Sequence, residues 1–120
     1  PQLDVCFWEG TQCTIDPKRP DQQMVTGINW ARRNLTGTLP PELGLLTDLT
    51  TVDVAQNQIQ GTLEPLYQLV NAKEIFVFDN QLTGPLTRNL EYCGNLTRFM
   101  AGFNQLTGPL PALSMKNLSK

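Results

Sequence analysis

The sequence predicts an α/β solenoid, in which the chain winds through coils of similar length that stack side by side. The first observation is that the stretch QNQIQGTL at 56–63 recurs with variations at three other places: 32–39, 79–86 and 103–110. The glycines of these copies stand at positions 37, 61, 84 and 108, so the period is 24, 23 and 24 residues. The second observation is that apolar residues stand two positions apart shortly before each copy, which is the period of a strand with one buried face.

Composition narrows the kinds of chemistry and partner. The chain has 120 residues, a net charge of −2 and no basic run, so we do not expect nucleic acid as a partner. It contains no histidine, which is the commonest general base and metal ligand. The carboxylates show neither metal-ligand spacing nor a recognisable catalytic pair, so we expect no enzyme activity, no metal site and no cofactor. No apolar run approaches the ~20 residues of a membrane-spanning helix, and we expect no membrane span in this segment.

Residues 1–24 lie outside the repeat pattern, and we predict that they form an N-terminal cap. A stack of coils has an open apolar end that a different structure must cover. Six residues separate Cys6 from Cys13. A disulfide closing so small a loop would stabilise the cap by roughly 2–3 kcal/mol. Phe7 and Trp8 stand between these cysteines, and we expect both to cover part of the first coil. A role for Trp8 in binding a ligand is the alternative.

Residues 25–120 are predicted to form about four repeats, the last of them incomplete. Each repeat places apolar residues at three fixed positions, which indicates a short strand with one buried face. Stacking sets these strands side by side as a parallel sheet. The apolar residues are Val25, Ile28 and Trp30, then Leu49, Val52 and Val54, then Ala72, Ile75 and Val77, and finally Leu96, Phe99 and Ala101.

An asparagine follows the strand in three of the four repeats, at Asn57, Asn80 and Asn104. The chain turns there while buried, and an amide side chain can both donate hydrogen bonds to the turn and accept them from it. We therefore predict a structural ladder of stacked asparagines. The glycine four residues later permits backbone conformations that other residues resist. The first repeat departs from the pattern with Arg33, as is expected of a terminal repeat.

The return side of each coil is predicted to hold a short helix or 3₁₀ turn. In the first repeat this segment opens on Pro40 and Pro41 and carries leucines at 39, 43 and 46. Leucines at 63, 66 and 69, and then at 86 and 90, repeat the arrangement. The last repeat stops after its return segment, where another strand would begin. We expect either that the array continues in a longer chain or that another subunit covers the open end.

Repeat by repeat, the sequence resembles the plant-type leucine-rich repeat, whose pattern is L-x-x-L-x-L-x-x-N-x-L-x-G-x-L/I-P. The segment from Leu49 to Leu63 matches this pattern, and Cys6 to Cys13 resembles the paired-cysteine cap of the same family. Similar repeats occur in receptor-kinase ectodomains and polygalacturonase-inhibiting proteins. The resemblance implies a right-handed solenoid with a parallel concave β-sheet, short helical or 3₁₀ turns on the convex side, and a second short sheet. It does not imply an enzyme.

In this fold the residues between the buried strand positions face the concave side. Phe76, Phe78 and Met100 would be neighbours there, with one acidic and one basic residue beside them. Exposed aromatic and methionine side chains bordered by charge are typical of interface cores. A register shifted by one residue would bury both phenylalanines and expose two aliphatic residues instead. The candidate partner-binding residues are Asp53, Glu74, Phe76, Phe78, Arg98 and Met100.

Three N-x-Ser/Thr sequons begin at Asn34, Asn95 and Asn117. Together with the cysteine pair they favour a secretory route, with N-glycans on a secreted or cell-surface protein. The alternative is that repeats rich in Asn, Leu and Thr create sequons by chance. Cys93 stands alone on a return segment, where we expect a buried free thiol rather than an intermolecular disulfide.

Two functions remain open. The first is a non-catalytic recognition scaffold outside the cell, which binds another protein or a peptide through the concave face. The second is a structural subunit of a larger complex, in which a neighbouring chain covers the open end of the array. A threonine array for ice or a flat matrix is disfavoured, because Gln60 interrupts the copies at Thr36, Thr83 and Thr107.

Overall fold

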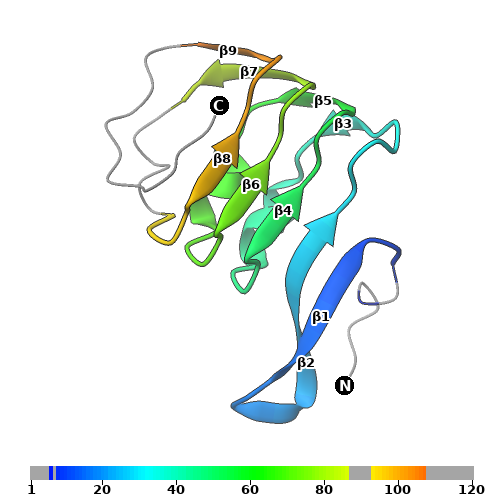
Figure 1. Ribbon diagram of the computed structural model, residues 1–120, viewed down its shortest axis with the longest axis vertical. Helices are drawn as coiled ribbons and strands as arrows, with labels where there is room; N and C mark the ends of the chain where they lie inside the picture. The colour runs from blue at the N-terminus through cyan, green and yellow to red at the C-terminus, as the bar shows by residue number, and fades with distance from the viewer. Residues whose placement is uncertain (1–5, 7, 87–92, 108–120) are drawn as a thin grey trace.

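The computed structural model describes residues 6, 8–86 and 93–107 and places them in a solenoid with two sheets (Figure 1). The larger sheet has the strand order β1-β2-β4-β6-β8, and the second sheet has the order β3-β5-β7-β9. The repeat period therefore predicted the architecture correctly. The strands are β1 (Thr11–Asp16), β2 (Arg19–Asn29), β3 (Thr36–Thr38), β4 (Thr51–Asp53), β5 (Gln58–Gly61), β6 (Glu74–Phe76), β7 (Gln81–Pro85), β8 (Arg98–Met100) and β9 (Gln105–Thr107).

The N-terminal end of the larger sheet is an antiparallel hairpin of β1 and β2, whose tip extends away from the coils (Figure 1). At the tip the Asp16 carboxylate accepts hydrogen bonds from the Lys18 N–H at 2.9 Å and from Arg19 Nε at 3.0 Å. A disulfide between Cys6 and Cys13 ties the start of the described chain to β1. Because β2 runs through residue 24 without a break, the boundary drawn there between cap and repeats stays a prediction.

The remaining strands of the larger sheet are parallel and aligned. Ile28 pairs with Val52, Val52 with Ile75, and Ile75 with Phe99, so one column of buried apolar side chains runs through four coils. Such a column removes apolar surface from water only because neighbouring coils cover each other. Each coil therefore depends on the coils beside it.

The convex side carries 3₁₀ turns in the first two coils, η2 (Pro41–Leu45) and η3 (Glu64–Gln68). Both have proline in the first turn. Backbone bonds between residues three apart close them, from the Leu46 N–H to the Leu43 carbonyl at 3.1 Å and from the Leu66 N–H to the Leu63 carbonyl at 2.8 Å. Leu43 of η2 and Leu66 of η3 close the core opposite the larger sheet.

The ladder asparagines hold neighbouring coils together, as the bonds of Asn80 show. Its Nδ2 donates to the carbonyls of Val54 and Val77, each at 3.1 Å, and its Oδ1 accepts from the Ile59 N–H at 3.0 Å. Val54 and Ile59 belong to the preceding coil. Asn57 and Asn104 make equivalent bonds. Each asparagine therefore satisfies its own turn and the coil before it.

The turns around the ladder require left-handed backbone conformations. The residue before each ladder position has a positive φ, which is 60° at Gln56 and 58° at Asp79. Gly61 has a φ of 85°, and a Cβ added there would lie 3.0 Å from Thr38 Cγ2 of the preceding coil. Glycine thus fits both the backbone angle and the close approach of neighbouring coils in the second sheet.

Two residues expected in the core are only half-buried, and both lie at an end of the described array. Trp30 faces the cap, where its ring centroid lies 6.3 Å from that of Trp8. Ala101 belongs to the last described coil, where no described coil packs on its outer side. The other strand positions are buried as predicted. Phe7, Leu90 and the last repeat from 108 onward lie outside the described residues.

Candidate functional site

The concave face of the larger sheet is built from side chains that alternate with the buried residues. Backbone pairing aligns these side chains in columns across the coils. One column contains Asn29, Asp53, Phe76 and Met100, and the next contains Ala31, Ala55, Phe78 and Gly102. The character of the face changes along the array, from small and polar residues in the first two coils to aromatic ones in the third.

The third and fourth coils carry an apolar patch that we call the concave patch, made of Phe76, Phe78 and Met100. All three side chains are half-buried. Ile75 and Val77 are 0% exposed in the core, which places the phenylalanines on the concave side of the strand. Phe76 pairs with Met100 on the neighbouring strand, so their side chains stand next to each other.

Glu74 and Arg98 stand beside the concave patch as an ion pair. Arg98 Nη1 lies 3.5 Å from Glu74 Oε2, and the two side chains are 56% and 37% exposed. A pair this exposed contributes at most about 1 kcal/mol to stability, because water screens it.

Next to the patch, the first two coils leave a hollow of about 340 Å³, which we call the alanine hollow. Ala31 and Ala55 stand where the third coil has Phe78, and the missing side-chain volume creates the space. The Asp53 carboxylate accepts a hydrogen bond from the Ala55 N–H at 3.1 Å, and Arg32 Nε donates to Gln56 Oε1. The hollow is lined by Asn29, Ala31, Arg32, Asp53, Ala55, Gln56 and Phe78.

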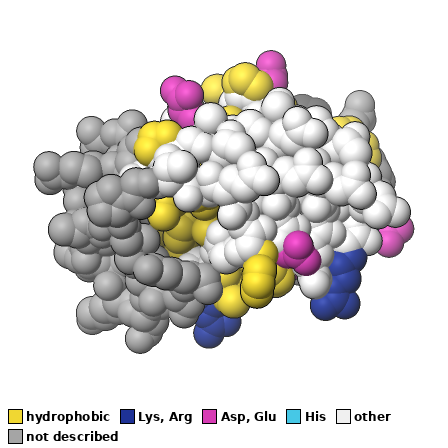
Figure 2. All heavy atoms as spheres, turned by 90° about the horizontal axis from the view of Figure 1, so that it is seen from above, with side chains coloured by type: hydrophobic (Ala, Val, Ile, Leu, Met, Phe, Trp, Pro, Cys, Tyr) yellow, Lys and Arg dark blue, Asp and Glu magenta, His cyan; other side chains and the backbone are white. Residues whose placement is uncertain are grey.

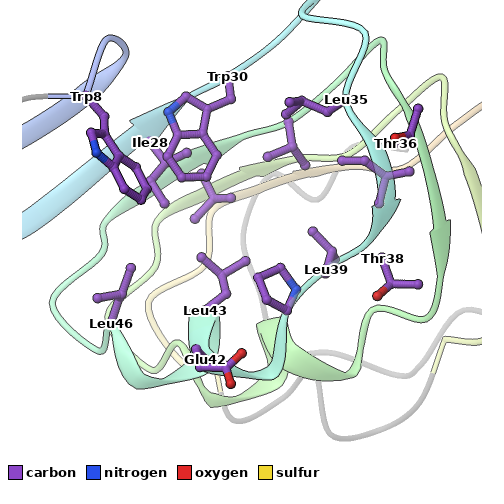
Figure 3. Close-up of a pocket in the computed structure, with 14 residues that line it drawn as sticks. Trp8, Ile28, Trp30, Leu35, Thr36, Thr38, Leu39, Glu42, Leu43 and Leu46 are labelled. Atoms are coloured by element: carbon purple, nitrogen blue, oxygen red, sulfur yellow. The ribbon is translucent and has the colours of Figure 1, made fainter. Parts of the chain in front are cut away.

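An apolar cavity of about 470 Å³ opens between the cap and the first coil (Figure 3). Trp8 and Trp30 stand on one side of it, and Leu43 and Leu46 of the return segment stand on the other (Figure 3). Among the described residues, its lining includes core residues of the first two coils and a single ionisable side chain, Glu42. The cavity is therefore continuous with the hydrophobic core. Trp8, expected to cover the first coil, is 58% exposed at its edge.

The second sheet presents a flat, uncharged polar face. Figure 2 looks down on the side where this sheet lies in Figure 1, and most of the described surface there is neither charged nor hydrophobic. The outward side chains of its strands are threonines, glutamines and Pro85, all exposed. No aromatic side chain interrupts the described part of these strands, so this face offers less to a protein partner than the concave patch.

The remaining predicted sites are the single thiol of Cys93 and the three sequon asparagines. Burial raises the pKa of the Cys93 thiol to about 11, and its sulfur lies 3.6 Å from the Leu66 carbonyl oxygen. Asn34 and Asn95 are exposed, while Asn117 lies outside the described residues.

Among the residues that the structure describes, no three His, Cys, Asp or Glu side chains are grouped to hold a metal ion. The same part of the chain contains no helix long and apolar enough to cross a membrane.

Sequence reasoning placed the concave patch but missed the alanine hollow. Ala31 and Ala55 lie between buried strand positions, so the alternation predicts them on the concave side, but it does not predict the space that their small side chains leave. Arg32 and Gln56 lie one residue before the ladder and were assigned to no face. The signal was available, because a column reading Ala, Ala, Phe, Gly across aligned repeats predicts a step in the surface. Arg32 and Gln56 both line the alanine hollow.

Comparison with known proteins identifies the repeats. No family model matches the chain. The receptor-like kinase TMK4 of Arabidopsis thaliana is 32% identical over 81 residues, which cover 68% of this chain and 8% of that protein. The BIR2 ectodomain of A. thaliana superposes with a TM-score of 0.77 and 21% identity, over 89% of this chain and 55% of that one. The plant peptide hormone receptor RGFR1, solved in complex with RGF2, gives a TM-score of 0.70 and 22% identity, over 88% and 19%.

The chain thus spans less than a tenth of the curated relative, and the kinase activity in that name belongs to the relative. The structural neighbours are leucine-rich-repeat ectodomains and establish the fold. The repeat pattern, the solenoid and the matched region agree with one another. The chain belongs to the leucine-rich-repeat proteins of the plant type.

Proposed function

We propose that this chain is part of an extracellular recognition module that binds a protein or peptide through its concave face. The observation that carries the proposal is the concave patch, where Phe76, Phe78 and Met100 stand half-exposed. The core side of the same strands is already filled by the buried residues Ile75, Val77 and Phe99. Apolar side chains that the core does not need are typical of interface centres. The contacts that we propose are Asp53, Glu74, Phe76, Phe78, Arg98 and Met100.

The comparisons support a recognition role in general terms. RGFR1 is a peptide hormone receptor solved with RGF2, and another neighbour is a complex between BIR3 and SERK2. Both structures share the fold seen here and contain a bound partner. The concave location and the identity of the partner are our proposals for this chain. The extracellular location is likewise our proposal, and it is supported by structural neighbours such as BIR2 and SOBIR1, whose solved parts are ectodomains.

The test begins with a library of random peptides displayed on phage and selected against the full chain. The best peptide is then synthesised and its affinity measured for Phe76→Ala, Phe78→Ala and Met100→Ala. Each substitution is expected to weaken binding by about 1–3 kcal/mol if these residues are hot spots. Gln58→Ala is the control, because Gln58 is an exposed strand residue of the second sheet. Unchanged affinity in all three patch variants rejects the concave-face proposal.

Glycosylation is a separate part of the proposal. We propose that Asn34, Asn95 and Asn117 carry N-glycans, since each begins a sequon and the first two are exposed. The intact mass of the natural protein is measured before and after enzymatic removal of glycans. A mass decrease supports the secretory route. An unchanged mass rejects glycosylation and removes the support that the sequons give to an extracellular location.

The structure also offers an observation in favour of the second function, a subunit whose last coil is covered by a neighbour. Phe103 is 87% exposed beside a hollow of about 190 Å³ that Leu86, Phe99 and Leu106 help to line. This alternative predicts that the isolated chain self-associates, because water would otherwise contact this apolar edge. Sedimentation velocity over a range of concentrations tests it. A monomer that unfolds cooperatively at all concentrations counts against the alternative.

A further inference from the structure

We propose that Asp79 and Phe103 together bind a cationic group of the partner, which is an arginine or lysine side chain or a chain-end amine, at the rim of the concave face. The inference rests on the proposed function, because it names the chemistry that the partner presents beside the concave patch. Both residues stand directly before a ladder asparagine, Asp79 in the third coil and Phe103 in the fourth.

The backbone places the two residues next to each other. The Asp79 N–H donates to the Gly102 carbonyl at 2.9 Å, and Gly102 directly precedes Phe103. Neighbouring strands of a sheet lie about 4.8 Å apart, so equivalent residues of adjacent coils are direct neighbours. Asp79 also directly follows Phe78 of the concave patch. A partner that covers the patch can therefore reach both residues.

The backbone angle at Phe103 is unfavourable for phenylalanine. The residue before each ladder position has a positive φ, which is 58° at Arg32, 60° at Gln56, 58° at Asp79 and 56° at Phe103. Four different side chains share this angle, so the turn imposes it. Aspartate and asparagine tolerate such a φ better than bulky side chains do. Asp79 therefore suits its turn, whereas folding alone gives no reason for an aromatic ring at Phe103.

The Phe103 side chain also lies largely outside the core. Phe103 is 87% exposed, more than any other large apolar residue that the structure describes. Its ring therefore has a face to offer to a ligand. The face of an aromatic ring carries partial negative charge and attracts a cation that lies within about 6 Å of the ring centroid.

The Asp79 carboxylate supplies a full negative charge beside this ring. Asp79 is exposed, and among the described residues it takes part in no ion pair. Glu74 stands at the start of β6 and is already paired with Arg98. Gln56, the equivalent residue of the preceding coil, is uncharged. A cation that stacks on the ring can thus form an ion pair with Asp79, and the planar guanidinium of arginine fits both contacts.

Selection from a random peptide library on phage tests the inference with five forms of the full chain. These are the wild type, Asp79→Asn, Asp79→Lys, Phe103→Asn and the control Asp48→Asn. Asp48 is an exposed carboxylate in the turn between η2 and β4. We expect basic residues to be enriched beside apolar ones for the wild type and for the control. Asp79→Asn and Phe103→Asn should lose this enrichment, and Asp79→Lys should select acidic residues instead.

Synthetic versions of the best peptide separate the sources of the cation. One version replaces the basic side chain by a neutral one of similar length, and the other has an acetylated N-terminus. One of them should bind the wild type about fivefold more weakly while its affinity for Asp79→Asn is unaffected. Phe103→Leu keeps an apolar side chain but lacks the ring, and it should weaken the unmodified peptide about threefold.

Urea unfolding separates the binding role of Phe103 from a role in folding. Phe103→Asn should unfold at a higher urea concentration than the wild type, because asparagine accepts the positive φ more easily. Phe103→Ala also removes the ring but tolerates this angle less well, so it should unfold at a lower concentration than Phe103→Asn. A lower midpoint for Phe103→Asn than for the wild type would show that the ring packs in the fold, and would overturn the inference.

The remaining outcomes distinguish this inference from the proposed function. Peptides without a basic bias, or equal losses for Asp79→Asn and Asp48→Asn, overturn the inference but leave the proposed function standing. Self-association that disappears in Phe103→Asn while basic peptides still bind assigns the ring to a neighbouring chain and overturns the inference as well. Failure to enrich any peptide that is sensitive to Phe76→Ala overturns both.

Discussion

The third coil and the first coil follow the same backbone path with different side chains at the turn. In the third coil Asn80 bonds to carbonyl and N–H groups of the second coil. In the first coil Arg33 occupies the equivalent position and contacts Glu9 of the cap. The difference shows that each ladder asparagine serves the coil before it. The first coil has no coil before it, so an amide is not needed there.

Packing also differs between the two coils, because the third coil has a neighbouring coil on both sides and the first coil packs against the cap on one side. Val77 and Ile75 of the third coil are fully buried between neighbours on both sides. In the first coil Trp30 is half-exposed, and Ile28 lines the apolar cavity against the cap. Stability in a solenoid is the sum of each coil and its interfaces with neighbours. Interior coils should therefore tolerate substitution less than the coil beside the cap.

Truncation of a core isoleucine should give the largest effect and tests this difference directly. Ile75→Ala is expected to lower the free energy of unfolding by about 3–5 kcal/mol, because packed neighbours surround the new space. Ile28→Ala should cost about 2–3 kcal/mol, because it enlarges a cavity that already exists. Urea unfolding followed by circular dichroism measures both. Equal losses would mean that the cavity is filled in solution.

Removal of one ladder amide should come next. Asn80→Ala leaves the Ile59 N–H and the Val54 and Val77 carbonyls without their partner, at a cost of about 2–4 kcal/mol. Arg33→Ala removes only a contact with the exposed Glu9 and should cost less than about 1 kcal/mol. The same urea experiment compares them. A cost for Arg33→Ala equal to that of Asn80→Ala would contradict the assignment of each amide to the preceding coil.

Breaking the disulfide should affect the first coil and spare the third. The variant with both Cys6→Ser and Cys13→Ser is expected to lose about 2–3 kcal/mol of stability in the cap. Amide hydrogen exchange should speed up in β1 and β2 while β6 keeps its protection, because contacts in a solenoid run only between neighbours. Reductant added to the wild type should reproduce the result. Uniform acceleration across all strands would show one cooperative unit instead.

The sequence predicted what is periodic and failed where the period ends. Strand positions such as Val52, Ile75 and Phe99 were placed correctly because the same environment recurs in each coil. Trp30 was expected in the core, but its neighbour is the cap, about which the repeat pattern holds no information. The hairpin of β1 and β2 begins in that same unrepeated region and ends in the first repeat.

The candidate site divides in the same way. The concave patch follows from the alternation of side chains along β6 and β8, which the pattern determines. The alanine hollow depends on differences between columns in successive coils, so it appears only when the coils are aligned in space. The bond from Arg32 to Gln56 likewise joins residues that are far apart in the sequence. The role of the concave patch in partner binding is a proposal that binding experiments decide.

The smallest expected effect lies at the hairpin tip, which is the part of the cap farthest from the coils in Figure 1. The pKa of Asp16 is lowered from 3.8, mainly by the hydrogen bond from the Lys18 N–H and further by Arg19. A carboxyl with a lower pKa in the folded state contributes stability above its unfolded pKa and loses it as the pH falls through the folded value. The wild type should therefore be more stable than Asp16→Asn at neutral pH, and the difference should shrink below about pH 4.

Urea unfolding at a series of pH values measures the difference between the wild type and Asp16→Asn. Asp21→Asn is the control, because Asp21 is an exposed carboxylate on the same strand, β2. Since the hairpin tip touches no other coil in the described sheet order, this pH dependence should appear in exchange of β1 and β2 amides and not in those of β6. A pH-dependent change of equal size in β6 would mean that the cap and the third coil unfold together, and that the contrast between the two coils disappears in solution.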